Sequence, residues 1–426
     1  MISRLEHTEE HAAHRAAVRS FCEETIAPAV EGYDRAGEFP EPLLRAVGEA
    51  GFGGVAYPTD CGGGGLDFRS WAITIEELAR SWKLLAGAVN VNGALVGYPI
   101  FTFGADWQRT DWLAPVLRGE AVSAFAMTEL GAGSDAANMR TTAERDGDEW
   151  VLDGHKVWTT NGSIADLLVV VARTSDRGNK GLSLFGVPDP GGRDGVEVVR
   201  DIPCLEGPAA LETELRLDGV RVPADHLVGE VDRGFRYIME GLDIGRIGTA
   251  AQGVGVAQAA FEASLDYAGE REQFGRPIGE FEGVGFKLAD MATRTEAARL
   301  LTLAAADARD RGERVTTQAA MAKVFATDAA MDIAVEAVQV HGGRGYSTDL
   351  PVERYLREAK GMQIYEGTNE INRLVVANRL FEARAAETAS AETGEAASAA
   401  KADETDDAAK ADETDDAAGD PDADEA

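Results

Sequence analysis

The stretch Tyr365-Glu366-Gly367-Thr368-Asn369-Glu370-Ile371 places a carboxylate at the junction of two expected helices. Gly367 interrupts the helical pattern before it, and Thr368 or Asn369 can cap a new helix that starts at Glu370. An aromatic residue before Glu366 and a glycine after it would leave the carboxylate partly desolvated and open to a ligand. Desolvation raises the pKa of a carboxyl group and makes it a usable general base near neutral pH. The alternative is that Glu366 is one of many surface acids. The other motifs of the chain distinguish between these two interpretations.

Length and composition limit the kind of protein that this sequence encodes. At 426 residues the chain is long enough for two or three domains with cores of their own. It has no run of about 18 apolar residues, and its N-terminus carries acids where a signal peptide has an apolar segment. Three cysteines lie far apart without a C-x-x-C pair, and the six histidines lack metal-ligand spacing. We therefore expect a cytoplasmic protein without membrane insertion, disulfides or a metal site.

The formal net charge of −33 makes nucleic acid and anionic membranes poor partners. A surface rich in carboxylates suits a high-salt cytoplasm, because the charges keep it hydrated and salt screens their repulsion. The sequence favours this halophile-like interpretation over an ordinary acidic protein from a GC-rich genome, although part of the charge lies in the tail.

Hydrophobic periodicity divides the chain into three folded regions and a tail. Residues 1–119 are predicted to be helical, and their first long helix covers Glu9–Ala29 and is closed by Pro28. Residues 120–232 change to short alternating segments, and residues 233–385 return to long amphipathic helices. Residues 386–426 are rich in Ala, Glu, Asp and Thr without an aromatic, and a segment that starts at Lys401 repeats from Lys410. This composition predicts a disordered, self-repelling tail.

The middle region has the pattern of a compact antiparallel barrel or sandwich, since its short β candidates have turns and no helices between them. Asp153-Gly154 and Asp218-Gly219 are two of the predicted turns. The candidates are Ala121–Thr128, Thr141–Arg145, Glu149–Leu152, Lys156–Thr159, Leu167–Arg173, Ser183–Val187, Val196–Arg200 and Leu211–Leu217.

The last folded region has the pattern of a four-helix bundle, with wide apolar faces and short connections. Its predicted helices are Phe235–Ala268, Phe286–Arg311, Thr316–His341 and Glu370–Ala383, with a shorter one over Val352–Met362. The predicted fold class is therefore α+β and multidomain: an N-terminal helical domain, a central β domain and a C-terminal helical bundle.

A glycine-rich loop, Met127-Thr128-Glu129-Leu130-Gly131-Ala132-Gly133-Ser134-Asp135, follows the first β candidate. Its glycines also satisfy a dinucleotide fingerprint, but a Rossmann unit needs a helix and then a parallel strand, and a β-hairpin follows here. The loop resembles the flavin loop of the acyl-CoA dehydrogenases, T/S-E-P-G-x-G-S-D, with Leu130 in place of the proline. The resemblance implies that the chain binds FAD and that the contacts come from Phe125, Met127, Thr128, Gly133 and Ser134.

The stretch Lys156-Val157-Trp158-Thr159-Thr160-Asn161-Gly162 resembles the K-x-W-I-T-N-G motif of the same family. An indole such as that of Trp158 can stack on one face of an isoalloxazine ring and exclude water. By this resemblance, the hydroxyl of Thr160 forms a hydrogen bond with flavin N5, which accepts the hydride.

Three motifs of the predicted bundle extend the resemblance: Leu242–Gly248 is similar to L-D-x-G-R-I, Arg271–Ile278 to R-x-Q-F-G-x-P-I, and Gln339–Tyr346 to Q-x-x-G-G-x-G-Y. In the family the first lines the acyl-CoA site, and the other two reach the FAD of a neighbouring subunit, which implies an oligomer, commonly a homotetramer. The implied FAD contacts in this region are Arg271, Phe274, Gln339, Gly342, Gly343, Thr368 and Glu370. The implied acyl-CoA contacts are Ser134, Asp243, Arg246, Tyr365 and Gly367.

The resemblance implies FAD-dependent α,β-dehydrogenation of an acyl-CoA thioester to the trans-2-enoyl-CoA, as in fatty acid β-oxidation. Glu366 would take the α-proton while the β-hydrogen leaves as a hydride to flavin N5. The backbone N–H of Glu366 and a ribityl hydroxyl of FAD would stabilise charge on the thioester oxygen. A subset of relatives carries the base immediately before the arginine that matches Arg246, but Gly245 occupies that position here. Glu366 is therefore the candidate base.

The sequence constrains two properties less closely: the identity of the electron acceptor and the length and branching of the acyl chain. The length of the chain favours a dehydrogenase that passes electrons to an electron-transfer flavoprotein over an acyl-CoA oxidase that uses oxygen. A non-catalytic flavin- or acyl-CoA-binding protein would be expected to lack Glu366 or Trp158, and both are present. The L-D-x-G-R-I pattern resembles the short-chain, butyryl-type branch more than the isovaleryl branch.

Overall fold

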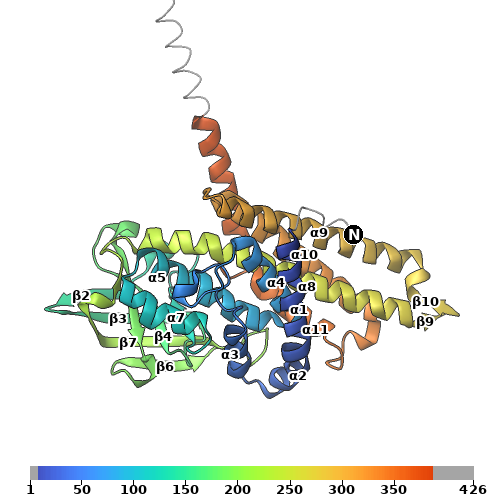
Figure 1. Cartoon of the computed structure of the whole chain (residues 1–426), viewed down its shortest axis with the longest axis horizontal. Helices are drawn as coiled ribbons and strands as arrows, with labels where there is room; N and C mark the ends of the chain where they lie inside the picture. The colour runs from blue at the N-terminus through green and yellow to red at the C-terminus, as the bar shows by residue number, and fades with distance from the viewer. Residues whose placement is uncertain (1–7, 387–426) are drawn as a thin grey trace, which may run out of the picture. The chain divides into compact units, whose positions relative to one another are not determined.

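Helices form the N-terminal region, as predicted. A computed structural model describes residues 8–386, and Figure 1 shows the order of the elements. Helix α1 (Glu9–Phe21) begins at Thr8, whose side chain accepts a hydrogen bond from the backbone N–H of His11. A π-helical turn, Cys22–Ile26, joins α1 to α2 (Ala27–Ala36). The prediction that Pro28 ends this helix is wrong, because Pro28 lies in the first turn of α2, where a helix tolerates a missing N–H.

Helix α4 (Phe68–Asn90) is the central helix of this region, and most of its side chains are buried. The stretch Phe68–Phe103 is long and apolar enough to cross a membrane by length and composition, but 78% of its apolar window is buried inside the protein. Packing within the fold therefore accounts for its apolar character. The remaining helices of the region are α3 (Glu41–Glu49), α5 (Tyr98–Phe103), α6 (Asp106–Gln108) and α7 (Ala114–Leu117).

A single eight-stranded sheet forms the middle region of the described chain. Its order is β6-β7-β3-β2-β4-β5-β8, with β1 paired to β4. Most neighbours are antiparallel, as predicted, but β1 and β2 each run parallel to β4, so the sheet is mixed. The strands are β1 (Ser123–Ala126), β2 (Thr142–Asp146), β3 (Glu149–Thr160), β4 (Leu167–Arg173), β5 (Leu182–Pro188), β6 (Val196–Asp201), β7 (Glu212–Pro223) and β8 (Leu227–Val228).

Two of the predicted turns are wrong. Strand β3 continues through Asp153-Gly154, where the pairing with β7 shifts by a bulge, and β7 continues through Asp218-Gly219. Long antiparallel pairing between β3 and β7 outweighs the local turn preference of an Asp-Gly pair. The sequence also did not predict β8, nor the two-residue strands β9 (Glu272–Gln273) and β10 (Arg276–Pro277), which form a hairpin in the arginine motif.

The C-terminal region is helical, as predicted, with α8 (Gly234–Glu270), α9 (Glu282–Asp310), α10 (Thr316–His341) and α11 (Val352–Met362). Residues 369–386 are also helical. Helices α8, α9 and α10 pack side by side (Figure 1), and α8 also packs on α4 of the N-terminal region. Alanine and other small residues on α8 and α10 allow this close approach.

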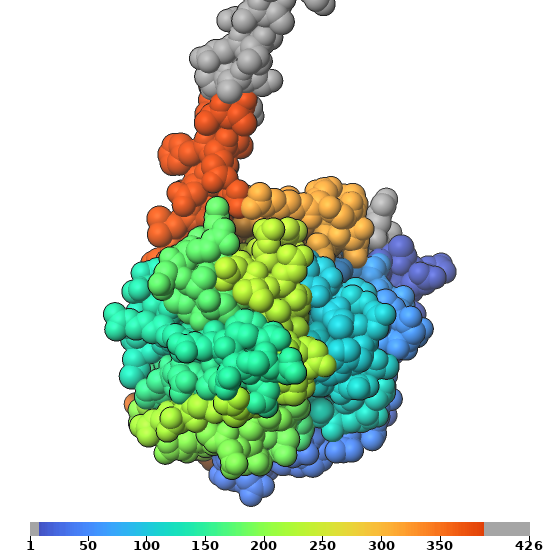
Figure 2. All heavy atoms as spheres, turned by 90° about the vertical axis from the view of Figure 1, so that its left-hand side faces the viewer, coloured from blue at the N-terminus to red at the C-terminus, as the bar shows by residue number. Residues whose placement is uncertain are grey.

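The helix–sheet–helix order predicted from the sequence is thus observed. Figure 2 shows one face of the molecule, on which sheet residues (green) lie beside N-terminal helices (blue to cyan). The described residues up to Arg373 form one compact unit, and those from Leu374 onward form a second. The exact domain boundaries at residues 119, 232 and 385 stay predictions, and the predicted tail lies, apart from residue 386, outside the described residues.

Candidate functional site

Glu366 lies in the loop between α11 and the helix that starts at residue 369, in a backbone conformation that few side chains adopt. Its φ is +57° and that of Gly367 is +85°. The side chain of Thr368 accepts from the N–H of Ile371, so Thr368 caps the following helix. The carbonyl of Gly367 accepts hydrogen bonds from Lys323 Nζ at 2.9 Å and from Asn372 Nδ2 at 2.7 Å. Such a strained position persists only where its surroundings fix it, and here they do.

The carboxyl group of Glu366 has one hydrogen-bonded oxygen and one free oxygen. Asn90 Nδ2 donates to Oε1 at 3.1 Å, while buried Oε2 has no partner among the described residues. Burial raises the pKa of Glu366 to about 8, against the opposing effects of Arg246, Lys323 and the Asn90 hydrogen bond. The group therefore has the raised pKa that the sequence analysis expects of a general base, and its catalytic role stays a prediction.

Gly245 on α8 provides the space that this carboxyl group occupies. A Cβ atom at Gly245 would lie 2.1 Å from Oε2 of Glu366. Asn90 Nδ2 also donates to the carbonyl of Gly245 at 3.2 Å, which ties α4, α8 and the loop together. Any other side chain at position 245 would displace Glu366.

Arg246 and Asp243, two of the predicted acyl-CoA contacts, lie beneath the loop and have protein partners. Arg246 Nη1 pairs with Asp243 Oδ1 at 2.9 Å, and Arg246 Nε donates to the carbonyl of Glu366 at 3.3 Å. Thr316 Oγ1 donates to the other Asp243 oxygen at 2.5 Å, and burial raises the pKa of Asp243. In the described chain these two residues support the loop, and their contact with a substrate stays a prediction.

Tyr365, another predicted acyl-CoA contact, is held from two sides. Its hydroxyl donates to Gln252 Oε1 at 2.8 Å, and Lys83 Nζ lies 4.9 Å from the centre of its ring. Lys83 is buried and pairs with both carboxylate oxygens of Glu206, at 2.9 and 2.7 Å. A buried ion pair thus backs the aromatic residue that precedes the candidate base.

The glycine loop and the tryptophan motif form one unit around Lys156. Lys156 Nζ donates to the carbonyl of Met127 at 3.0 Å and to Glu129 Oε1 at 2.9 Å, and the N–H of Val157 donates to the carbonyl of Thr128 at 2.9 Å. Burial would raise the pKa of Glu129, but Lys156 and two backbone N–H groups lower it to about 2. The predicted flavin residues Thr128 and Trp158 are therefore fixed on adjoining segments.

The side chains of this unit differ in exposure. Trp158 is 53% exposed, with φ of +57°, while Phe125 is buried in an apolar cluster of the core. An exposed indole in a strained conformation is a feature of a binding surface. Of the other predicted FAD contacts, the partly buried ones are Met127, Thr128 and Thr160, and the exposed ones are Gly133 and Ser134.

The arginine motif (Arg271–Ile278) follows the C-terminal end of α8, and the glycine-pair motif (Gln339–Tyr346) lies at the C-terminal end of α10. The two motifs are beside each other. Tyr267 stacks on His341 with ring centres 4.3 Å apart, and this contact joins the two ends. Phe274 is 95% exposed, with φ of +53°. Within residues 8–386, no hydrogen bond, ion pair or ring contact joins either motif to Glu366. The predicted FAD contacts Arg271, Gln339, Gly342, Gly343 and Glu370 are exposed, and Thr368 is partly buried.

Three residues with roles at these sites were not predicted. Asn90 and Lys323 both contact the Glu366 loop, and Glu212 accepts a hydrogen bond from the Thr160 hydroxyl. Their only signal in the sequence is a polar residue on an otherwise buried helix face or in a strand, and many such residues have structural roles. Among residues 8–386 no group of three or more His, Cys, Asp or Glu side chains could hold a metal ion.

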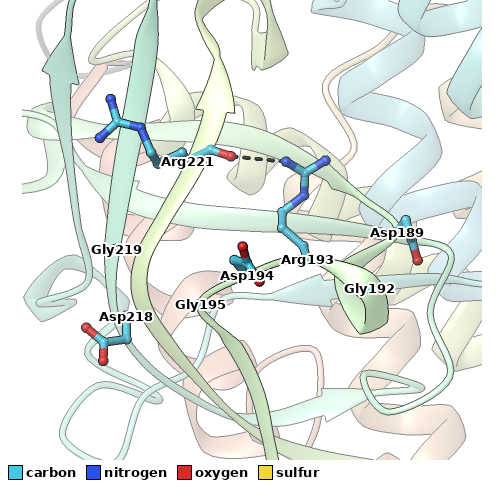
Figure 3. Close-up of a pocket in the computed structure, with 8 residues that line it drawn as sticks. All are labelled: Asp189, Gly192, Arg193, Asp194, Gly195, Asp218, Gly219 and Arg221. Atoms are coloured by element: carbon cyan, nitrogen blue, oxygen red, sulfur yellow. Dashed lines mark hydrogen bonds between the residues drawn. The ribbon is translucent and has the colours of Figure 1, made fainter.

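A surface hollow of about 480 Å³ lies elsewhere, on the sheet region (Figure 3). Arg193 Nη1 donates to the carbonyl of Arg221 at 3.0 Å across it. None of the predicted site residues lines this hollow, so its size does not make it the reaction site. Its lining residues are Asp189, Gly192, Arg193, Asp194, Gly195, Asp218, Gly219 and Arg221.

Comparisons with known proteins agree with this arrangement of motifs. The family profiles that match are Acyl-CoA dehydrogenase, N-terminal domain (residues 8–120), middle domain (124–220) and C-terminal domain (232–381). The mitochondrial short-chain specific acyl-CoA dehydrogenase of Mus musculus is 40% identical over 378 residues, covering 88% of this chain and 91% of the relative. The structure of butyryl-CoA dehydrogenase from Megasphaera elsdenii has a TM-score of 0.85 at 36% identity, covering 88% of this chain and 98% of its own. A chain from a structural study of the electron transferring flavoprotein of Acidaminococcus fermentans has a TM-score of 0.85 at 41% identity, with the same coverage of 88% and 98%.

Proposed function

Since the chain belongs to the acyl-CoA dehydrogenase family, whose members are FAD enzymes, we propose that it oxidises an acyl-CoA thioester to the trans-2-enoyl-CoA with Glu366 as the base. The observation that carries this proposal is the Glu366 carboxyl group, which is buried and keeps one oxygen without a partner among the described residues. Most buried polar atoms are paired, so an unpaired carboxyl oxygen in this loop is a candidate for contact with a ligand.

Glu366 suits the removal of a weakly acidic proton. Its pKa of about 8 makes its carboxylate a stronger base than a solvated glutamate. Only the ionised carboxylate of Glu366 can accept the proton, so the rate of proton removal rises with pH up to about pH 8. The hydrogen bond from Asn90 to Oε1 leaves Oε2 as the atom that receives the proton.

The same residue supplies a hydrogen-bond donor for the thioester. The backbone N–H of Glu366 makes no hydrogen bond to another described residue. A thioester oxygen that accepts from this N–H gains stabilisation as negative charge develops on it. Lys323 and Arg246 hold the carbonyls of Gly367 and Glu366, so the backbone that presents the N–H is already fixed before the substrate binds.

The residues of the other motifs fit FAD. When bound, FAD would accept a hydride, which is two electrons and one proton, from the β-carbon of the substrate. Trp158 presents an exposed ring, and we assign it with Thr128 and Thr160 to the flavin end of the cofactor. A Cβ atom at Gly342 or Gly343 would meet no protein atom, so neither glycine is needed for packing within this chain. Backbone without side chains can approach a pyrophosphate closely, and we assign this pair to that end.

We also propose a homotetramer, in which the arginine and glycine-pair motifs serve the FAD of a neighbouring subunit. Phe274 and Tyr346, one in each motif, are 95% and 90% exposed in the single chain. Large exposed aromatic groups are typical of surfaces that bind another molecule. The likeness to a chain studied with an electron transferring flavoprotein supports a partner of that kind as the electron acceptor.

The proposed substrate is a short-chain acyl-CoA. The names of the Mus musculus and Megasphaera elsdenii relatives support this choice, as does the resemblance of the L-D-x-G-R-I motif. An acyl-CoA oxidase stays the alternative. We keep the reduced cytoplasm as the proposed location, where the spacing of the three free cysteines is compatible with reduced thiols.

Turnover of the purified protein on a series of acyl-CoA esters of increasing chain length tests the proposal. We expect a yellow oligomer with bound FAD, fastest turnover on the short esters, and turnover that depends on an electron-transfer flavoprotein. Equal turnover with oxygen alone would favour the oxidase. A colourless monomer that FAD cannot reconstitute would contradict the proposed function itself.

A further inference from the structure

The Thr160 hydroxyl has an unexpected carboxyl partner. Its Oγ1 lies 3.0 Å from Oε1 and 3.2 Å from Oε2 of Glu212. Thr160 on β3 and Glu212 on β7 are directly opposed in the antiparallel register, and the N–H of Asn161 donates to the carbonyl of Leu211 at 2.7 Å beside them. The sheet itself therefore holds the two side chains together.

Glu212 lies in surroundings that do not neutralise its charge. The basic group that acts on Glu212 is Lys83 on α4, and the ammonium of Lys83 is bound by Glu206. The other titratable groups that face Glu212 are Glu206 and Cys204, both on the loop before β7. Burial, with the charge of Glu206, raises the pKa of Glu212 to about 7, while the hydrogen bond from Thr160 and the charge of Lys83 oppose the shift.

The protonation of Glu212 decides what the Thr160 hydroxyl can do. An ionised carboxylate only accepts hydrogen bonds, so it takes the single hydroxyl hydrogen of Thr160. A protonated Glu212 can donate to Oγ1 instead, which frees the hydroxyl hydrogen for another acceptor. One proton on Glu212 thus changes the hydrogen-bonding character of the surface that Thr160 presents.

We propose that Glu212 is a positioning residue of the flavin site, which orients the Thr160 hydroxyl and takes up a proton when FAD is reduced. The inference rests on the proposed function in one respect, the contact of Thr160 with the flavin. Reduction adds two electrons and one proton to FAD, either together as a hydride from the substrate or as electrons from dithionite with a proton from water, and leaves one extra negative charge there. That charge disfavours an ionised Glu212, so the carboxylate binds a second proton from water.

The test is the midpoint potential of bound FAD as a function of pH in the wild-type oligomer and in Glu212→Gln. The amide of the variant still accepts a hydrogen bond from Thr160 but does not titrate. For a two-electron couple, each additional proton steepens the fall of the potential by about 30 mV per pH unit. We expect the two lines to meet below about pH 6 and the wild-type potential to fall more steeply from about pH 7 upward, as the linkage requires.

Parallel lines for the two proteins from about pH 6 to about pH 9 would overturn the inference, since Glu212 would then take up no proton. Glu212→Ala, which is also neutral, replaces the Gln variant if that protein does not retain FAD. Thr160→Val separates the two proposals. If it changes neither the absorption spectrum nor the potential of the flavin, then Thr160 does not contact the flavin, and the assignment of Thr160 within the proposed function is wrong. If it shifts the potential while the lines for wild type and Glu212→Gln stay parallel, only the role of Glu212 is wrong.

Discussion

Glu76 and Glu366 are both buried carboxyl groups, yet their pKa values move in opposite directions. Glu76, on α4, is 3% exposed and accepts hydrogen bonds from Arg15 at 2.7 and 3.1 Å and from Arg299 at 3.0 Å. Burial would raise its pKa, but Arg299 and Arg15 outweigh that effect and lower it to about 2. The pKa of Glu366 rises to about 8 although Arg246 and Lys323 are nearby.

The two pKa values differ because the neighbouring basic side chains donate hydrogen bonds to different groups. The arginines around Glu76 donate directly to its carboxylate, whereas Arg246 and Lys323 donate to the carbonyls of the Glu366 loop. Burial also lowers the pKa of Lys323 to about 7, which weakens its influence as the pH rises. Burial therefore leaves Glu366 with a raised pKa because the neighbouring cations bind backbone carbonyls and do not pair with its carboxylate.

The largest expected effect is that of Glu366→Gln, which keeps the size of the side chain but cannot accept a proton. We expect the rate at which acyl-CoA bleaches the flavin without oxygen to fall by about 10²–10⁴-fold or more, because no other base lies in the loop. Glu370→Gln, an exposed change four residues on at a predicted FAD contact, should keep substantial activity because the amide keeps the size of the side chain. Bleaching by the Glu366 variant at close to the wild-type rate would place the base elsewhere.

Glu76→Gln should have a large effect on stability and none on the pH dependence of the reaction. Removing one partner of a buried ion pair costs about 3–5 kcal/mol, to be measured by urea unfolding. The folded pKa of about 2 lies below the ordinary value of 4.5, so the contribution is present above pH 4.5 and is lost as the pH falls toward 2. The difference between variant and wild type should shrink accordingly on acidification.

The matched control for that measurement is Glu31→Gln, since Glu31 pairs with Arg35 at the surface, where the two side chains are 70% and 63% exposed. An exposed pair contributes about 0–1 kcal/mol. Equal losses in the two variants would show that the buried cluster around Glu76 is not special.

Asn90→Ala should have a smaller effect, on the pKa of the base. Asn90 donates to Glu366 and favours its ionised form, so its removal raises the pKa further. A hydrogen bond to a charged group contributes about 1.5–3 kcal/mol, which corresponds to roughly one to two pKa units. The acidic limb of the rate of flavin reduction should move to higher pH by that amount. Asn92→Ala, whose side chain pairs with Ser123, should leave the limb in place.

Removal of the residues after 386 should have no effect. The composition of that segment, without an aromatic residue, offers nothing for a core to bury. FAD content, oligomeric state and turnover of the truncated protein should match those of the full chain. Loss of the flavin or of the oligomer would show that the acidic segment has a docking role.

The parts of this molecule that could be predicted from its sequence are those with local signals. Helices α8, α10 and α11 follow from their apolar periodicity, and the Glu366 loop follows from a glycine between two helical patterns. Where pairing with a segment distant in the sequence determines the local structure, a prediction from neighbouring residues is wrong. Asp153-Gly154 has the composition of a turn, but pairing with β7 carries the strand through it.

The same limit applies to the site. Asn90 and Lys323 reach Glu366 from α4 and α10, and nothing in the residues beside them in the sequence indicates that contact. Glu212 is comparable, because its meeting with Thr160 depends on the register between β3 and β7. Side chains brought together by long-range packing are the part of a site that a single sequence does not show.

The exchange of the substrate α-hydrogen with solvent tests the central claim most directly, because it measures proton removal without hydride transfer. An acyl-CoA analogue that cannot transfer its β-hydrogen is incubated with the FAD-loaded oligomer in deuterated water. We expect the wild-type protein to exchange the α-hydrogen, faster as the pH rises toward about 8, and Glu366→Gln to bind the analogue without exchange. Exchange by the variant at the wild-type rate would contradict the assignment of Glu366 as the base.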